Sequence, residues 1–392
     1  MLDYLKAWSP IRLIVTGCLG VMFLAGINFK GWDFNAGRDF LGFYVGASLV
    51  GSPTLYNPEA NLAVQRKLGA REIDSIIFVR LPYFAAILRP LTWIQYRAAI
   101  LAWGFLSVAS LIGFALVFPY EESRITLFML CWFIPAAFAI RVGQDPPFVI
   151  LWIAIALRLR MHKRLFLAGL VFSLCLEKWH LLIFIPILFL LRREWRVFAG
   201  FVTGSAVLIA FSFALQGPDF AREYWAAMHL PNMNALPLLM PNLLGSLAFF
   251  EFFGLSHSIA VALYWGLAIV ITLLVLFACV RQQFEIALPV ALIAGLLLSP
   301  HDYLHDWTIA FPALLMLWRV MPAIVSILLL PAATLPLGLN IGIVLPITVA
   351  AFQILIELTI PGEQGTPVEG VRSAISRPRG PGDSGSPQSV GA

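Results

Sequence analysis

Polar and ionisable side chains stand at the edges of long apolar runs in this 392-residue chain. They occur in the first loop around Asp39, in the turn RVGQDPP, in the corner EKWH, in the loop 216–256 and in the segment SPHDYLHDW. Ionisable groups at a membrane edge are costly and are therefore candidates for function. If all of these stretches lie on one face, they predict a single site there.

Asp39 opens the helix-like stretch DFLGFYVGASLV. Helical spacing puts Gly42, Phe43 and Gly46 on its face and leaves volume beside the carboxylate, which a ligand could fill. The alternative is that Asp39 caps the helix start while the glycines permit close packing. The two interpretations are compatible, since a helix start also holds a carboxylate rigidly.

Three further side chains suit the binding of a sugar or a phosphate. Lys178 offers a compact positive charge, although a salt bridge to Glu177 or a reach towards the headgroups would also explain it. Gln144 carries an amide donor and acceptor in a proline-bounded turn, and turn formation alone is the alternative for its neighbours. His180 could bond a sugar hydroxyl or simply fill the interface.

The stretch HDYLHD and the later loop contain paired polar residues. His301 with His305, and Asp302 with Asp306, would each share a face if the stretch is helical. Such groups can bind a divalent metal, but capping and headgroup contacts also favour them at a span boundary, and we expect no metal. Asn242 and Ser246 are likewise four apart, either near the site or capping a short re-entrant helix.

Composition identifies the class of protein that must position these residues. The chain is 60% hydrophobic and 12% charged, with a mean hydropathy of +0.88. Repeated apolar runs are long enough to cross a bilayer as helices, so we expect an all-α polytopic membrane protein. The basic residues are spread among short loops, so no nucleic-acid partner is expected. The four cysteines have unrelated spacings and predict neither disulfides nor a metal site.

The apolar runs predict about twelve membrane spans. They lie near 11–28, 97–118, 125–141, 147–160, 164–178, 179–191, 196–215, 257–280, 285–299, 307–319, 321–336 and 341–360. If the spans alternate, the clusters RLRMHKR and RREWR fall on one side, which the positive-inside rule assigns to the cytoplasm. Every polar stretch named above then faces outward.

The connections between spans differ in kind. The first outer loop, 29–96, contains three pieces that predict short amphipathic helices in the membrane interface: DFLGFYVGASLV, NLAVQRKLGA and PYFAAILRPLTWI. The second outer loop, 216–256, predicts another interfacial or re-entrant element. Residues 361–392 are rich in Gly, Pro and Ser and predict a disordered cytoplasmic tail. Residues 1–360 therefore form a single membrane domain.

The motifs of the outer face occur in an order that is similar to a known family. The pattern Asp39-Phe40, Tyr44, Ala47, Gly51, Pro53 and LYNP resembles the first loop of glycosyltransferase family 87, membrane enzymes of the GT-C type. Gly143-Gln144, Lys178 with Pro186, Asn242 with Ser246, and SPH at 299–301 follow in the same order. Asp145-Pro146-Pro147 and Trp179 depart from the family pattern, which puts the identity of the substrate in doubt more than the reaction type.

The resemblance implies a chemistry for these positions. Family members use polyprenyl-phosphate sugars as donors, and no other cofactor is implied. Asp39 resembles the catalytic aspartate and would act as general base, while Lys178 and His301 would hold the donor phosphate. Gln144, His180, Asn242, Ser246 and Tyr44 would contact the substrates.

The expected function is transfer of a hexose to a lipid-linked or cell-envelope acceptor, with mannose as the leading candidate for the sugar. The enzyme would be a multi-pass protein of the bacterial plasma membrane with its site on the periplasmic side. A transporter or flippase of lipid-linked glycans is the alternative, but it should place polar residues at mid-membrane depth. A non-catalytic membrane subunit is a third possibility, and it would not need Asp39 and Lys178 to converge.

Overall fold

The computed structural model describes residues 5–29, 38–69, 76–229, 254–299 and 302–318. Helix accounts for 79% of it, and these ranges contain no strand. The all-α fold class is therefore confirmed. The expected spans 321–336 and 341–360 and the tail 361–392 lie outside the described residues.

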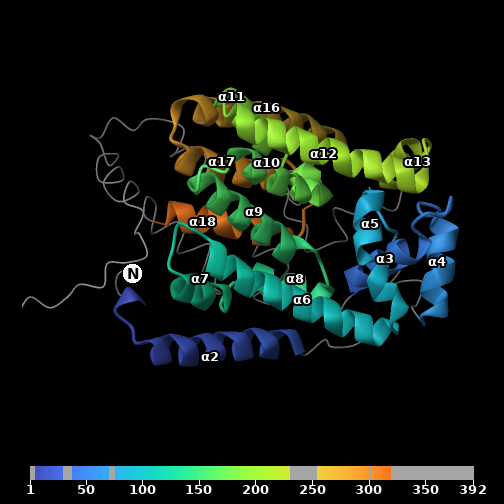
Figure 1. The fold of residues 1–392 in the computed structure, drawn as a ribbon, viewed down its shortest axis with the longest axis horizontal. Coiled ribbons are helices and arrows are strands. Elements are labelled where there is room, and N and C mark those ends of the chain that lie inside the picture. The colour runs from blue at the N-terminus through green and yellow to red at the C-terminus, as the bar shows by residue number, and fades with distance from the viewer. Residues whose placement is uncertain (1–4, 30–37, 70–75, 230–253, 300–301, 319–392) are drawn as a thin grey trace, which may run out of the picture.

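Long apolar helices form a bundle, and shorter helices gather at one end of it (Figure 1). The bundle contains α2 (Pro10–Phe29), α6 (Tyr96–Val117), α7 (Ser123–Leu130), α8 (Ile134–Val142), α9 (Pro146–Met161), α10 (Leu165–Ser173), η3 (Leu174–Leu181), α11 (Phe184–Leu191), α12 (Trp195–Gln216), α16 (His257–Arg281), α17 (Phe284–Leu298), η4 (Asp306–Ile309) and α18 (Ala310–Leu317). The short helices at the end are α3 (Arg38–Leu49), α4 (Pro58–Lys67), α5 (Pro82–Leu88), η2 (Arg89–Trp93) and α13 (Phe220–Met228).

The helices differ in their capacity to cross a bilayer. Among the described residues, α6, α12 and α16 are long and apolar enough, and α7 with α8 makes a fourth candidate if that bent pair counts as one span. Other apolar helices are shorter, such as α9 with 16 residues and α17 with 15. The count of twelve spans is thus not confirmed by helix length.

The expected span 125–141 is not one straight helix. It is two helices, α7 and α8, bent by 65° with respect to each other. Phe133 between them is extended (φ −88°, ψ 99°), and Pro135 stands at the start of α8. Because proline has no backbone N–H, it is tolerated in the first turn of a helix and disfavoured in its interior. Pro135 therefore begins α8, after α7 has ended at Leu130.

The corner between the expected spans 164–178 and 179–191 is also broader than predicted. Helix α10 ends at Ser173, and the 3₁₀ segment η3 leads to α11. Inside η3 the backbone leaves helical geometry at Lys178 (φ −118°, ψ 37°). This kink allows consecutive residues of η3 to point to different surroundings.

Helices α10 and α12 pack with their backbones in close contact. A Cβ atom added at Gly169 of α10 would overlap the carbonyl oxygen of Val197, and one added at Gly200 of α12 would overlap that of Phe166. Small residues at such positions let two membrane helices approach closely. The contact fixes α10, and with it the start of η3.

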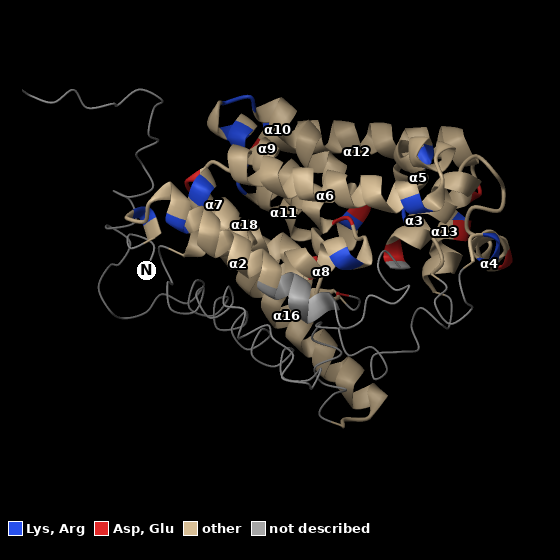
Figure 2. Cartoon of the chain, turned by 90° about the horizontal axis from the view of Figure 1, so that it is seen from below, with Lys and Arg blue, Asp and Glu red and all other residues tan. Residues whose placement is uncertain are grey.

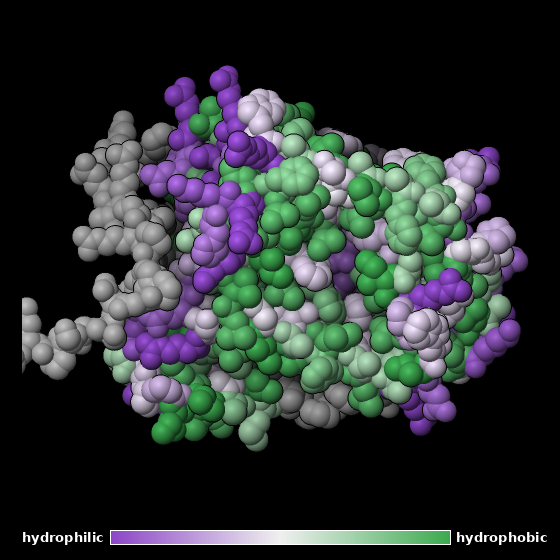
Figure 3. Space-filling view, in the orientation of Figure 1, coloured by the Kyte–Doolittle hydropathy of each residue, from purple (hydrophilic) through white to green (hydrophobic). Residues whose placement is uncertain are grey.

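On the face that Figure 3 shows, hydrophilic side chains gather at the two ends and hydrophobic ones cover the middle, while Figure 2 also places charged residues beside α8, between the ends. At one end the expected cytoplasmic clusters meet, since Arg160 donates to both carboxylate oxygens of Glu194 at 2.9 and 2.7 Å. The two turns there contain Lys163 and Arg193, both with positive φ (59° and 56°). The prediction that RLRMHKR and RREWR share one end is confirmed.

The short helices of the first loop are present and form the opposite end. They surround an aromatic core in which Phe40 stacks on Trp103 of α6 with ring centroids 5.4 Å apart. The side-chain amide of Gln216, the last residue of α12, accepts from Gly51 N at 3.0 Å and donates to the carbonyl of Ser52. The loop is therefore attached to the bundle at both α6 and α12. Its position in a membrane interface stays a prediction.

Candidate functional site

A chain of hydrogen bonds links three of the residues that the sequence singled out. Gln144 Nε2 donates to Asp39 Oδ2 at 2.8 Å, and Lys178 Nζ donates to Gln144 Oε1 at 3.4 Å. The positions of these residues in the chain are 105 and 34 residues apart. The predicted convergence of Asp39, Gln144 and Lys178 is thus a feature of the structure.

Lys178 also contacts two buried carboxylates. Its Nζ donates to Asp306 Oδ1 at 2.7 Å and forms an ion pair with Asp145 Oδ1 at 3.1 Å. Arg80 Nε donates to the other oxygen of Asp145 at 3.1 Å. The side chains of Lys178, Asp145 and Asp306 are only 3%, 0% and 2% exposed. We call Arg80, Asp145, Lys178 and Asp306 the ion network.

The ion network differs from what the sequence suggested for Lys178. Its partners are Asp145 and Asp306, whereas Glu177 Oε1 is buried without a hydrogen-bond partner. Because Lys178 is 2% exposed, it does not extend towards headgroups either. The expected salt bridge is therefore present, but with Asp145 and Asp306 in place of Glu177, and the reach towards the headgroups is wrong.

Neighbouring residues of its own segment also contact the Asp306 carboxylate. Its Oδ2 accepts from Tyr303 N at 3.0 Å, and His305 Nε2 lies 3.5 Å from the same oxygen. Asp302 accepts instead from Trp307 Nε1 at 2.8 Å. Residues 302–305 are not helical, since η4 begins at Asp306. The helical pairing considered for HDYLHD is therefore not formed by the described part of that stretch.

The turn after α8 places Gln144 and Asp145. Gly143 is left-handed (φ 76°, ψ 36°), a conformation that glycine adopts without steric cost, and Gln144 N donates to Ala139 O at 2.9 Å. Trp103 Nε1 donates to Gly143 O at 2.9 Å, which ties the turn to α6. Pro146 then begins α9. The turn is fixed on both sides, so Gln144 and Asp145 point in set directions.

Asp39 lies in the first turn of α3 and is half-buried. A carboxylate near a helix N-terminus is favoured by the helix dipole. The space expected beside it is filled, because a Cβ atom at Gly46 would overlap the ring of Phe78 and one at Gly42 would lie 3.0 Å from Ile76 Cγ2. The glycines serve close packing of α3 against residues 76–78, so that prediction of free volume was wrong.

The charges around Asp145 control its protonation. Burial alone would raise the pKa of the Asp145 carboxyl, but the charges of Arg80 and Lys178 outweigh it and hold the pKa below its usual value of 3.8. Burial would lower the pKa of Arg80, and Asp145 more than compensates, so that pKa is raised. Both groups are therefore charged at neutral pH.

The remaining predicted site residues have different positions. Tyr44 is buried in the aromatic core and donates to Ile94 O at 3.1 Å, outside the hydrogen-bond chain of Asp39. His180 is half-buried beside the ring of Trp179. Asn242, Ser246 and His301 lie outside the described residues. Substrate contacts by all five stay predictions.

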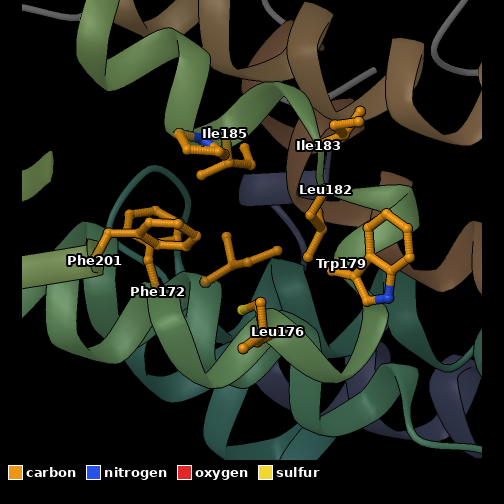
Figure 4. A pocket seen from close by; sticks show the side chains of 10 residues that line it. Phe172, Leu176, Trp179, Leu182, Ile183, Ile185 and Phe201 are labelled. Atoms are coloured by element: carbon orange, nitrogen blue, oxygen red, sulfur yellow. The ribbon is translucent and has the colours of Figure 1, made fainter. Parts of the chain in front are cut away.

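An apolar pocket of about 180 Å³ adjoins η3 (Figure 4). Its walls come from α9, α10, η3, α11 and α12, and include Phe172, Leu176, Trp179, Leu182, Ile183 and Phe201. Trp179, at 37% exposure, donates to Tyr224 OH of α13 at 3.2 Å. Residues 175, 176 and 179 of η3 thus line the pocket, while Lys178 enters the ion network.

The sequence did not single out Arg80 or Asp145 for the site, and it suggested Asp306 only as a partner of Asp302. A signal was present, because each is an ionisable residue near the boundary of an apolar run. Asp145 also follows Gln144 directly. Which cation pairs with which carboxylate depends on helix packing, and no local pattern contains it.

Comparisons with known proteins agree with the features of the sequence. The model of glycosyltransferase family 87 matches residues 81–300, more than half of the chain. The match includes Gln144 and Lys178, whereas Asp39 and Asp306 lie beyond its limits. Searches of curated proteins and of solved structures found no match. The apolar helices and the family match together show that the chain is a membrane protein belonging to glycosyltransferase family 87.

Proposed function

We propose that this glycosyltransferase transfers a hexose from a polyprenyl-phosphate donor to a lipid-linked or envelope acceptor, with mannose as the leading candidate for the sugar. The site would face the periplasm at the bacterial plasma membrane. The observation that carries the proposal is the position of Asp39. It is a half-buried carboxylate oriented by Gln144 at the end of the bundle opposite the basic turns.

Asp39 acts as general base in this proposal. Its carboxylate takes the proton of the acceptor hydroxyl while the acceptor oxygen bonds to the anomeric carbon of the sugar. The bond from that carbon to the phosphate oxygen breaks, and polyprenyl phosphate leaves with the electron pair. In the described structure the hydrogen bond from Gln144 occupies Oδ2, so Oδ1 is the oxygen suited to receive the proton.

The apolar pocket supports a lipid-linked donor. It lies against η3, the segment that also carries Lys178, so an isoprenoid chain in the pocket would have its phosphate near the polar end of the bundle. A chain of this kind gains roughly 0.8 kcal/mol for each CH₂ group that leaves water. The expected phosphate ligand His301 stays part of the proposal.

The enzyme is favoured over the transporter alternative. A transporter is expected to gather its polar groups around discontinuous helices at the bilayer midplane. Here the ion network and Asp39 are joined to the turns and short helices at one end of the bundle. Membership of a glycosyltransferase family also favours the enzyme.

Replacement of Asp39 tests the proposal. We expect Asp39→Asn to reduce hexose transfer at least about 100-fold, the lower range for loss of a general base, while binding of polyprenyl phosphate is retained. Asp219→Asn is the matched control, because Asp219 is 69% exposed at the same end and its ion pair among the described residues is with the exposed Arg222. Transfer by Asp39→Asn at the parental rate would remove Asp39 as the base.

The donor and the acceptor can be identified together. The purified full chain in lipid is incubated with radiolabelled polyprenyl-phosphate hexoses and with extracted envelope lipids. We expect label in an acceptor lipid with the mannosyl donor and none with a nucleotide sugar. Label transferred from a nucleotide sugar alone would contradict the donor class.

A further inference from the structure

Oxygens of three neighbouring side chains already surround the ammonium of Lys178, two as hydrogen-bond acceptors and one, Asp145 Oδ1, as an ion-pair partner. An ammonium carries three N–H donors. Three oxygens already lie close to Lys178 Nζ: Asp306 Oδ1 at 2.7 Å, Asp145 Oδ1 at 3.1 Å and Gln144 Oε1 at 3.4 Å. The side chain is 3% exposed. A phosphate bound to Lys178 would have to displace one of these oxygens.

The amide of Gln144 is oriented by its two neighbours. Lys178 can only donate and an ionised carboxylate can only accept. The amide therefore turns its Oε1 to Lys178 and its Nε2 to Asp39, as observed at 3.4 and 2.8 Å. The reverse orientation would place two donors together and two acceptors together.

We propose that Lys178 is a positioning residue that orients Asp39 through the amide of Gln144, and that it is not a ligand of the leaving phosphate. Asp145 and Asp306 hold the ammonium, the ammonium fixes the amide, and the amide fixes one oxygen of the base. The inference rests on the proposed function, because it assigns a role relative to the reaction of Asp39.

The two possible roles of Lys178 predict different kinetics. A phosphate ligand contributes to donor binding, so its loss raises KM for the donor and weakens binding of polyprenyl phosphate. A positioning residue acts on the base, so its loss lowers kcat while donor binding is unchanged. The expected decrease in kcat is roughly 10- to 100-fold, the size associated with a lost hydrogen bond to a charged group.

Gln144 variants test the link while all four members of the ion network stay in place. Gln144→Met removes both hydrogen bonds, and Gln144→Glu keeps an oxygen for Lys178 but removes the donor to Asp39. We expect both variants to lower kcat. Their Kd for polyprenyl phosphate should stay within about twofold of the parental value, which is the size of the deviations from additivity between distant sites. Gln95→Met is the matched control, an exposed glutamine before α6 without a side-chain cap bond.

Lys178 is replaced together with one of its carboxylates. Lys178→Met alone would leave buried negative charge uncompensated and could prevent folding. Lys178→Met with Asp306→Asn removes one charge of each sign, and Lys67→Met on the exposed end of α4 is the control. If Lys178 acts through Gln144, adding Gln144→Met to this pair lowers kcat little further.

The outcomes separate the inference from the proposed function. A parent protein that transfers no hexose from polyprenyl phosphate overturns both. An active parent whose Lys178 or Gln144 variants bind polyprenyl phosphate at least about tenfold more weakly overturns the positioning role alone. The positioning role is also overturned if kcat of the combined variant falls by the product of the two separate decreases, because independent sites contribute additively in free energy.

Discussion

The ion network joins two cations and two carboxylates in a space that is nearly closed to solvent. Arg80 is the most accessible member, with 12% of its side chain exposed. A buried ion pair is weak evidence for stability, but removing one partner is strongly destabilising because the other charge loses its compensation. The network is therefore sensitive to each of its members, whether or not it takes part in the reaction.

Replacement of Asp145 shows this sensitivity most directly. In Asp145→Asn, Asp306 is the one carboxylate of the network left for Arg80 and Lys178. We expect a loss of about 3–5 kcal/mol of folding free energy. Thermal unfolding in lipid or detergent measures it as a lower Tm, against Asp219→Asn as the exposed control. An unchanged Tm would show that water or lipid compensates these charges.

The lowered pKa of Asp145 predicts how stability depends on pH. A carboxyl whose pKa is lower in the folded than in the unfolded protein stabilises the fold above the unfolded value, and this contribution disappears as the pH falls through the folded value. For Asp145 the loss therefore begins below pH 3.8 and continues downward. Tm measured between pH 7 and pH 2 should fall less steeply at the acid end in Asp145→Asn than in the parent.

Part of the site follows from residue types alone. The convergence of Asp39, Gln144 and Lys178 could be predicted because ionisable and amide groups are rare at span edges, and alternating spans bring those edges together. The partners of Lys178 could not be predicted, because Glu177 is its neighbour in sequence whereas Asp306 is 128 residues away. The packing of both η3 and η4 against α9 and α17 makes that choice.

At the scale of the elements, apolar runs predicted where helices occur and failed where they break. The limits of α2, α6, α9, α12, α16 and α17 lie close to the expected spans. The bend between α7 and α8 lies at the extended residue Phe133 before Pro135, and the kink at Lys178 lies where that side chain enters the ion network. Hydropathy does not contain either kind of information.

The contact between α10 and α12 supplies a prediction for elements. Gly200→Ala puts a methyl group on the carbonyl of Phe166, so the helices must separate. We expect a loss of about 1–3 kcal/mol, the usual effect of overpacking, and a lower Tm. Gly104→Ala is the control, because a Cβ there meets nothing within 4 Å. Equal Tm values for the two variants would show that α10 and α12 can move apart freely.

At the scale of the whole molecule, the two polar ends of the bundle differ in charge. One end carries the exposed basic turns around Lys163 and Arg193, and the other carries the short helices and Asp39. The positive-inside rule assigns the basic end to the cytoplasm. The proposed site would then be open to the periplasm.

Cysteine labelling in intact cells tests this orientation. Lys67→Cys lies on the loop helix α4, and His162→Cys lies in the turn after α9; both positions are exposed. In a background without the four native cysteines, an impermeant maleimide should label position 67 in intact cells and position 162 only after permeabilisation. The opposite pattern would place Asp39 in the cytoplasm and contradict the proposed function.

The span of 128 residues between Lys178 and Asp306 also has a meaning for biosynthesis. Ribosomes add about 5–20 residues each second, so Lys178 leaves the ribosome on the order of ten seconds before Asp306. During that interval the nascent chain offers Lys178 just one partner of the network, Asp145, which Arg80 shares. Lys178 gains its second carboxylate partner only once η4 has been synthesised. Until then the insertion machinery holds a chain in which the charges of the ion network are not fully compensated.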